Sequence, residues 1–259
     1  LLEVVNVEKE FVSNPGLFQS KTSVKAVNDV SFKIYEGETL GLVGESGCGK
    51  STLGNVILQL DKATAGKVLY RGNDITKISK TELRKLRKEI QLIFQDPFSS
   101  LNPRIPVGKA IMEPMEVHHL YKNNKERKQK TLELLHRVGL DESHFNRYPH
   151  EFSGGQRQRI GIARTIAVEP KLIVCDESVS ALDISVQAQV LNLLNELKDK
   201  FGFTYIFISH DLAVVKYMAD QLLVMNQGKI VEQGDADQIY ANPEKEYTQK
   251  LIDAIPKGI

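Results

Sequence analysis

The sequence lacks the features that define several classes of protein. It has only two cysteines, Cys48 and Cys175, which are too few for a disulfide framework or a cysteine-built metal site. No apolar run approaches the ~20 residues that a membrane-spanning helix needs. Basic and acidic residues nearly cancel, leaving a net charge of +1, so the basic excess of a dedicated nucleic-acid binder is missing. Disulfide scaffolds are therefore excluded, and nucleic acid is disfavoured as a partner.

What remains is the composition of a soluble globular chain, and 259 residues suffice to bury a sizeable core. The N-terminus does not resemble a signal peptide, which predicts a cytosolic chain with both cysteines as free thiols. The chain begins Leu-Leu-Glu without Met, which indicates a trimmed chain or a domain of something longer.

The hydrophobic pattern predicts an α/β fold. Apolar residues alternate near the N-terminus as in half-buried strands, whereas after Gly155 helical periods and short apolar runs follow one another. That alternation is typical of a mostly parallel sheet covered by helices. Residues 107–150 show helical spacing with a polar, Lys-rich turn at 122–130, which indicates an inserted helical subdomain. Buried strands are expected at 39–43, 90–94, 172–175, 205–208 and 222–225, and helices at 50–60, 79–88, 156–168, 186–198 and 212–218.

A glycine-rich loop joins the first buried strand to the first helix. It matches the pattern G-x-x-x-x-G-K-[ST], in which glycines let the backbone N–H groups wrap a phosphate. A Lys in this position neutralises the β- and γ-phosphates, and the following hydroxyl binds Mg²⁺. We therefore predict a phosphate site for ATP, formed by Gly44, Glu45, Ser46, Gly47, Cys48, Gly49, Lys50, Ser51 and Thr52.

A second strand ends in two adjacent carboxylates. The apolar run 172–175 leads directly to Asp176 and Glu177. Downstream of a phosphate loop, the first carboxylate can hold Mg²⁺ through water, and the second can deprotonate a water that attacks the γ-phosphate. A strand that merely ends in a charged turn is the simpler alternative. The phosphate loop favours the catalytic interpretation.

A second glycine-containing helix start lies at Ser153, Gly154, Gly155 and Gln156. The residues alone indicate either a capped helix or a second anion site. Here the whole chain resembles the ABC ATPase family, and these four residues resemble its signature motif, which contacts the ATP held by a partner subunit. The resemblance implies a P-loop NTPase core with a mostly parallel sheet, an N-terminal antiparallel β subdomain and an inserted helical subdomain.

The resemblance also implies further site residues. Gln95 resembles the family's Q-loop glutamine, a ligand of Mg²⁺ and water that senses the transmembrane partner. Residues 180–183 resemble its D-loop, and His210 resembles the switch histidine on the γ-phosphate. Phe11 stands where the family usually has a Tyr that stacks on adenine. The implied catalytic residues are Glu177, His210, Lys50 and Gln95, and the implied Mg²⁺ ligands are Ser51, Gln95 and Asp176.

The resemblance narrows to the oligopeptide and dipeptide importer ATPases. It rests on residues 94–104, 147–152 and 187–190 and on the C-terminal pattern of 242–256, although nickel and metal-chelate importers share much of it. Three departures stand out. Ser178 follows Glu177 where Pro or Ala is usual, Glu246 replaces a common His-Pro, and no C-terminal cysteine cluster follows.

The resemblance implies one ABC ATPase domain, 1–259, on the cytoplasmic face of the membrane. Within it we expect a nucleotide-binding core at 1–95 and 160–259, a helical signature subdomain at about 96–159 and a C-terminal helical tail at about 235–259. The implied partners are a second ABC ATPase subunit, integral-membrane permease subunits and, indirectly, an extracytoplasmic substrate-binding protein, with no nucleic acid. Alternatives are a metal-chelate importer, a soluble ABC ATPase acting on DNA or ribosomes, and a nucleotide sensor without enzymatic activity.

Overall fold

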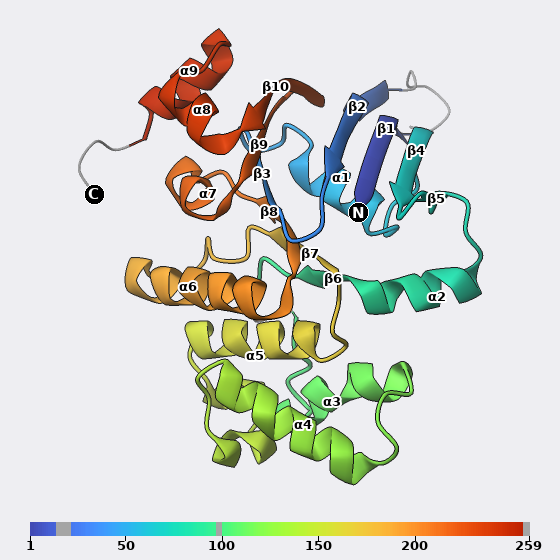
Figure 1. Cartoon of the computed structure of the whole chain (residues 1–259), viewed down its shortest axis with the longest axis vertical. Coiled ribbons are helices and arrows are strands. Elements are labelled where there is room, and N and C mark those ends of the chain that lie inside the picture. The colour runs from blue at the N-terminus through green and yellow to red at the C-terminus, as the bar shows by residue number, and fades with distance from the viewer. Residues whose placement is uncertain (14–21, 97–99, 256–259) are drawn as a thin grey trace. The chain divides into compact units, whose positions relative to one another are not determined.

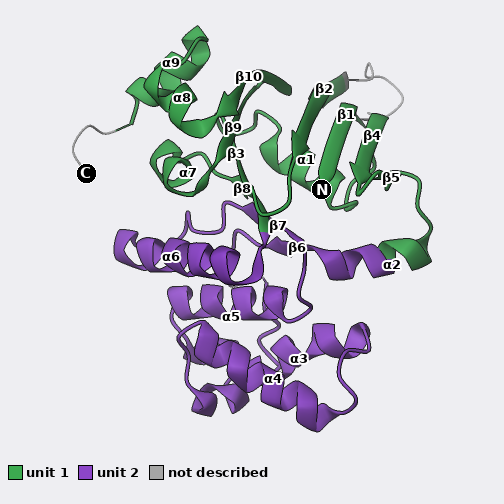
Figure 2. Ribbon diagram, viewed as in Figure 1, with its two compact units in different colours: residues 1–83, 204–259 green, residues 84–203 purple. Residues whose placement is uncertain are grey.

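A computed structural model describes residues 1–13, 22–96 and 100–255. The chain divides into two compact units, the first made of residues 1–83 and 204–259 and the second of residues 84–203 (Figure 2). Helix α2 (Lys80–Glu89) runs across the boundary in the sequence. Four residues on which the peptide-importer resemblance partly rests, Pro97, Phe98, Ser99 and Pro256, lie outside the described residues.

The first unit contains an antiparallel sheet built from the N-terminal strands (Figure 1). Its strand order is β2-β1-β4-β5, which confirms the expected N-terminal antiparallel subdomain. Alternate side chains at the start of β1, Leu2 and Val4, are buried, because one face of the sheet is covered. The strands are β1 (Leu2–Ser13), β2 (Thr22–Ile34), β4 (Ala65–Tyr70) and β5 (Asn73–Asp74).

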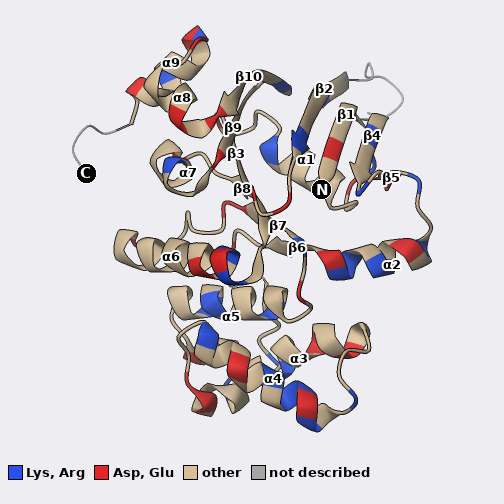
Figure 3. Ribbon diagram, viewed as in Figure 1, with Lys and Arg blue, Asp and Glu red and all other residues tan. Residues whose placement is uncertain are grey.

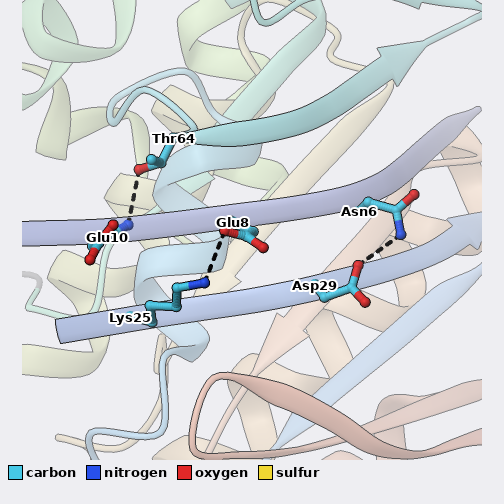
Figure 4. A network of polar contacts seen from close by, with 6 residues as sticks. All are labelled: Asn6, Glu8, Glu10, Lys25, Asp29 and Thr64. Carbon is cyan, nitrogen blue, oxygen red and sulfur yellow. Dashed lines mark hydrogen bonds and ion pairs between the residues drawn. The ribbon is translucent and has the colours of Figure 1, made fainter.

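Polar side chains hold the irregular part of this sheet together, as Figure 4 shows. The register of β1 and β2 shifts between Val4 and Val7, and Asn6 there has a left-handed backbone. The Asn6 amide donates to Asp29 at 2.7 Å across the strands. Further along, Lys25 pairs with Glu8 at 3.3 Å. β1 and β2 thus remain paired on both sides of the register shift.

The second group of strands in the first unit is mostly parallel. β3 (Thr39–Val43) lies between β8 (Thr204–Ile208) and β9 (Gln221–Asn226), parallel to both, and β10 (Lys229–Asp235) adds antiparallel to β9. Every residue of β3 and β8 is buried, as expected of strands whose two faces are both covered. Strand β10 was not predicted from the sequence.

Helices complete the first unit. α1 (Lys50–Ile57) follows β3, and α7 (Leu212–Met218) packs so closely over β3 that a Cβ on Gly41 would lie 2.4 Å from Val215. After β10 the chain forms two short helices, α8 (Ala236–Ala241) and α9 (Glu246–Asp253). They lie in the expected C-terminal helical tail.

The second unit is mainly helical. β6 (Ile90–Ile93) and β7 (Leu172–Asp176) form a parallel pair. α5 (Gly154–Ile166) contacts α3, α4, α6 and β6, and its Ile160 and Ile162 are fully buried, so it forms the centre of the unit. The other elements are α3 (Val107–Val117), α4 (Asn124–Arg137), α6 (Ile184–Phe201) and the 3₁₀ turns Glu142–Asn146 and Pro149–Glu151.

The predicted strands and helices are present, and one predicted turn is wrong. The Lys-rich segment at 122–130 is mostly the start of α4, which Asn123 caps by accepting from the Glu126 N–H at 3.0 Å. Figure 3 shows that α4 and α2 carry acidic residues among their basic ones. The many charges of 122–130 therefore belong to a solvated helix face. Within the described residues, no helix is both long and apolar enough to cross a membrane.

Candidate functional site

The glycine-rich loop connects the buried strand β3 to α1, as predicted. Gly44 and Gly49 have φ values of 150° and 110°, which side chains disfavour. A Cβ would lie 2.1 Å from the Met225 carbonyl oxygen at Gly44 and 2.0 Å from the Ala26 carbonyl oxygen at Gly49. Both positions therefore require glycine. Gly49 is also the N-cap of α1. Because it has no side chain, it cannot accept a hydrogen bond from the first N–H groups of this helix.

Lys50 lies inside the loop. Its side chain is buried, with 4% exposed, and its Nζ donates to the carbonyl oxygens of Gly44 at 2.7 Å and Glu45 at 2.9 Å. Two backbone carbonyls therefore hold the Lys50 ammonium group at the start of α1. This arrangement places positive charge where backbone N–H groups also converge, which suits a polyphosphate.

Cys48 differs from the expectation for a thiol in such a loop. Helix N–H groups can lower a thiol pKa, so the sequence predicts a reactive group. In the structure Cys48 is buried, and desolvation raises its pKa above the ordinary value, although the nearby Lys50 cation opposes this. The thiol is therefore predominantly protonated at neutral pH. The prediction of a lowered pKa is wrong, whereas the alternative that the sequence left open, a buried and unreactive thiol, agrees with the burial of Cys48.

His210 follows β8 and lies in the same unit as the phosphate loop. β3 and β8 are parallel, with Leu42 opposite Ile208, so the loop and the histidine leave the sheet at the same edge. The Ser209 N–H donates to the Leu42 carbonyl at 3.2 Å. The exposed His210 thus lies two residues beyond the end of β8. Its role on the γ-phosphate stays a prediction.

Phe11 lies on the outer half of β1. Its side chain is 46% exposed, and the Lys9 ammonium lies 4.8 Å from its ring centroid. An exposed aromatic face is the property that stacking on a nucleobase requires. Its role in adenine binding stays a prediction.

Gln95 and Glu177 are brought together within the second unit. The parallel pairing of β6 and β7 sets Ile93 opposite Cys175, so both residues follow the same sheet edge. The Gln95 side-chain nitrogen donates to the Glu177 carboxylate at 2.9 Å. Glu177 has a left-handed backbone, φ 45°, and its carbonyl accepts from the Ser180 hydroxyl at 2.9 Å. A tight turn therefore aims the carboxylate.

The predicted metal ligands have the chemistry that Mg²⁺ prefers. The described residues contain no cluster of three or more His, Cys, Asp or Glu placed to hold a metal. Mg²⁺, however, usually takes one or two carboxylates together with substrate phosphates and water. One carboxylate from Asp176, a hydroxyl from Ser51 and an amide oxygen from Gln95 are such a donor set. The residue types therefore fit the ion.

The predicted signature residues form a capping box at the start of α5. The Ser153 hydroxyl accepts from the Gln156 N–H at 3.3 Å, and the Gln156 side chain accepts from the Ser153 N–H at 3.0 Å. A Cβ on Gly155 would lie 2.3 Å from Val186 of α6, so this position needs a residue without a side chain. The side chains of Ser153 and Gln156 therefore each accept a hydrogen bond from the other residue's backbone N–H in the first turn of α5.

One contact to the phosphate loop was not predicted. The N–H of Glu45 donates to the hydroxyl of Tyr247, in α9, at 3.2 Å. Tyr247 appears in the C-terminal sequence pattern, but nothing in its local sequence shows that it reaches a loop near the N-terminus.

The comparisons with known proteins agree with this arrangement. The family model for ABC transporters matches residues 27–180. The chain belongs to the ABC transporter family. It is 53% identical to the "Oligopeptide transport ATP-binding protein OppF" of Bacillus subtilis, covering 99% of this chain and 82% of the relative. It is 50% identical to the "Dipeptide transport ATP-binding protein DppF" of Lactococcus lactis, covering 99% and 81%.

A solved structure supports the same classification. The ATP-binding cassette MJ0796, in a dimeric post-hydrolysis state bound to ADP and Pi, superposes with a TM-score of 0.80 at 29% identity. The match covers 91% of this chain and 99% of that chain. Together with the phosphate loop, family membership makes this chain an ATP-binding and ATP-hydrolysing cassette.

Proposed function

We propose that the chain is the ATPase subunit of a membrane importer for oligopeptides or dipeptides. The observation that supports this cargo is the similarity, at about half identity over 99% of the chain, to relatives named for peptide transport. Cargo is selected by other subunits of such systems, so this chain would supply the energy and not the specificity.

Each predicted residue has a proposed part in hydrolysis. Lys50 neutralises the β- and γ-phosphates, and the N–H groups of the glycine-rich loop bind the phosphate oxygens. Ser51, Gln95 and Asp176 hold Mg²⁺, which neutralises phosphate charge when bound. Glu177 takes a proton from the attacking water, and its hydrogen bond from Gln95 orients the carboxylate for that transfer. His210 contacts the γ-phosphate, and Phe11 stacks on adenine.

The proposed cycle needs partners. A second cassette, identical or paralogous, contributes the signature residues Ser153, Gly154, Gly155 and Gln156 to the ATP held by this chain. Closure of the pair around two ATP molecules drives integral-membrane permease subunits between two states, and hydrolysis resets them. The chain would thus be peripheral on the cytoplasmic face of the membrane, and an extracytoplasmic protein would deliver the peptide.

We also propose that 1–259 acts as a single ABC ATPase domain. The nucleotide-binding core is 1–95 and 160–259, the signature subdomain is about 96–159, and the tail is about 235–259. In a cassette of this organisation, the phosphate loop of one subunit and the signature of the other form a complete site only when two cassettes associate.

The proposed cargo is tested by asking whether this chain can take the place of a related ATPase subunit in cells. The chain is expressed in a Bacillus subtilis strain that lacks OppF, and uptake of a radiolabelled tripeptide, a dipeptide and ⁶³Ni²⁺ is measured. We expect restored peptide uptake, and none from the matched Glu177→Gln variant. Restored nickel uptake without peptide uptake would instead support a metal importer, and ATP hydrolysis without any uptake would contradict the proposal.

A further inference from the structure

The tail of the chain contacts the phosphate loop through one side chain. Tyr247 is half-buried on α9, and its hydroxyl accepts the N–H of Glu45 at 3.2 Å. Burial also raises the pKa of this phenol, which keeps it protonated over the physiological range. The contact joins positions far apart in the sequence within the same compact unit.

The bonded N–H belongs to a peptide unit that also holds the loop lysine. The carbonyl oxygen of this unit, from Gly44, accepts Lys50 Nζ at 2.7 Å, and its N–H, from Glu45, donates to Tyr247. In a trans peptide the two groups point in opposite directions, so Lys50 and Tyr247 lie at opposite edges of one plane. Rotation of that plane would weaken both hydrogen bonds, and polarisation along the chain couples their strengths.

The residue before this peptide cannot fix the plane by itself. Gly44 has no side chain, and glycine backbones adopt many conformations at little cost. The orientation of the Gly44–Glu45 peptide therefore depends on groups that hydrogen-bond its two edges, Lys50 within the loop and one group outside it. Tyr247 is such a group, because its ring is carried by a helix with its own anchors.

A nearly buried carboxylate anchors the segment that leads into α9. The Glu232 carboxylate, 9% exposed, accepts the N–H groups of Glu244 at 2.8 Å and Lys245 at 3.2 Å, just before α9. Burial alone would raise the pKa of Glu232, but the hydrogen bonds from the N–H groups of Glu244 and Lys245 outweigh it, so the pKa is lowered overall and the carboxylate is ionised. Tyr240, in α8, is not part of this anchor, because its hydroxyl donates to the Leu212 carbonyl of α7 at 2.7 Å.

We propose that Tyr247 is a positioning residue for nucleotide binding, which tethers the phosphate loop to the C-terminal helices. The tether presets the peptide plane that seats Lys50, so that less ordering is needed when a triphosphate binds. This inference rests on the proposed binding of ATP by the loop. It adds that the affinity depends on the state of α9.

The test compares two tyrosines of the same tail. Tyr247→Phe removes only the hydroxyl at the loop, and the matched Tyr240→Phe removes a hydroxyl that contacts α7. The Kd for MgATP and the Michaelis parameters are measured on the full chain. We expect Tyr247→Phe to raise both Kd and KM about threefold to tenfold, the range for one lost hydrogen bond. The kcat at saturating ATP should change less than about twofold, and Tyr240→Phe should leave Kd unchanged.

A second measurement reads the loop directly. Cys175 is 0% exposed, whereas Cys48, although also buried, is 7% exposed and lies in the loop, so alkylation of the native chain by N-ethylmaleimide reports on Cys48. We expect Tyr247→Phe to react severalfold faster without ATP, and Tyr240→Phe to react as the wild type does. Should Tyr247→Phe fold poorly, Glu232→Gln weakens the same tether from its anchored end and should shift both readouts in the same direction.

An unchanged or smaller Kd in Tyr247→Phe, or an equal rise in Tyr240→Phe, would overturn the proposal. A wild-type chain that binds no MgATP would defeat the proposed function itself, and it is recognised before any variant is compared.

Discussion

The two glycine-containing helix starts, one in each unit, solve the same problem differently. α1 begins at Gly49, which has no side chain, and the buried Lys50 follows at once. α5 begins at Ser153, whose hydroxyl and N–H both bond with Gln156. The first turn of any helix has N–H groups that need acceptors. In α5 the side chains of Ser153 and Gln156 provide some of these acceptors, whereas α1 leaves more of its N–H groups available to an anion.

The difference shows that glycine content alone does not identify a phosphate site. Both starts resemble anion sites in the sequence, yet only the first has a buried cation beside it. The second is a well-capped helix that needs no ligand for its own stability. We therefore infer that the second start acts on a nucleotide only when another surface delivers one.

The largest expected effect comes from removing the cation of the first start. Lys50→Ala should abolish MgATP binding at concentrations that saturate the wild type, because it removes the charge paired with the β- and γ-phosphates. Equilibrium binding of a fluorescent ATP analogue measures it, with the exposed Lys67→Ala as the control. Near-normal binding by Lys50→Ala would remove the distinction between the two helix starts.

A large effect on turnover without an effect on binding is expected in the second unit. Glu177→Gln should slow hydrolysis at least about 100-fold, because an amide cannot accept the proton of water. MgATP binding should persist and should yield an ATP-dependent dimer on size exclusion. Glu169, an exposed glutamate that also has positive φ, provides the control, and Glu169→Gln should hydrolyse normally. Wild-type turnover by Glu177→Gln would exclude the proposed general base.

The capped start can be disabled in two ways that separate its functions. Ser153→Ala removes the cap and should lower the free energy of unfolding by about 1 kcal/mol while preserving MgATP binding. Ser153→Arg also fills the helix start, so it should bind MgATP but fail to form the closed dimer. Both are measured by thermal unfolding and ATPase assay.

Mixing two inactive variants tests whether the start of α1 in one subunit and the start of α5 in the other form a shared ATP site. Lys50→Ala with Ser153→Arg should give heterodimers that have one intact composite site, and thus at most about half of the wild-type ATPase activity per dimer. The mixture is assayed at high protein concentration. Undiminished turnover by a monomeric Ser153→Arg variant would show that the signature plays no part.

The smallest effect is a pH dependence at Cys48. Its pKa is raised, so the thiolate fraction at pH 7 is smaller than that of a free cysteine, and alkylation should be severalfold slower than in the unfolded chain. The rate should keep rising with pH beyond the pKa of an ordinary thiol, and MgATP should protect the group. A rate that levels off below pH 8 would indicate a lowered pKa instead.

The parts of the molecule predicted from the sequence are those set by local pattern. Strand β3, the loop and α1 are adjacent in the chain, so one motif with its flanks sufficed. The family resemblance singled out Gln95 and Glu177, but their contact was not predicted, because the two strands that carry them are separated in the sequence by the helical insertion. The Tyr247 contact has no local signal, since it depends on how α9 packs. Cys48 was misjudged because its burial arises from tertiary packing.

Glu177 occupies a backbone conformation that glycine would adopt more readily. A non-glycine residue with φ 45° is less stable by ~1 kcal/mol, because its Cβ approaches the following carbonyl. A computational redesign that ranks substitutions by folding free energy would therefore choose glycine at this position early. If Glu177 is the general base, as proposed, the resulting cassette would be better folded and inert. Thermostabilisation of this ATPase should accordingly hold position 177 fixed.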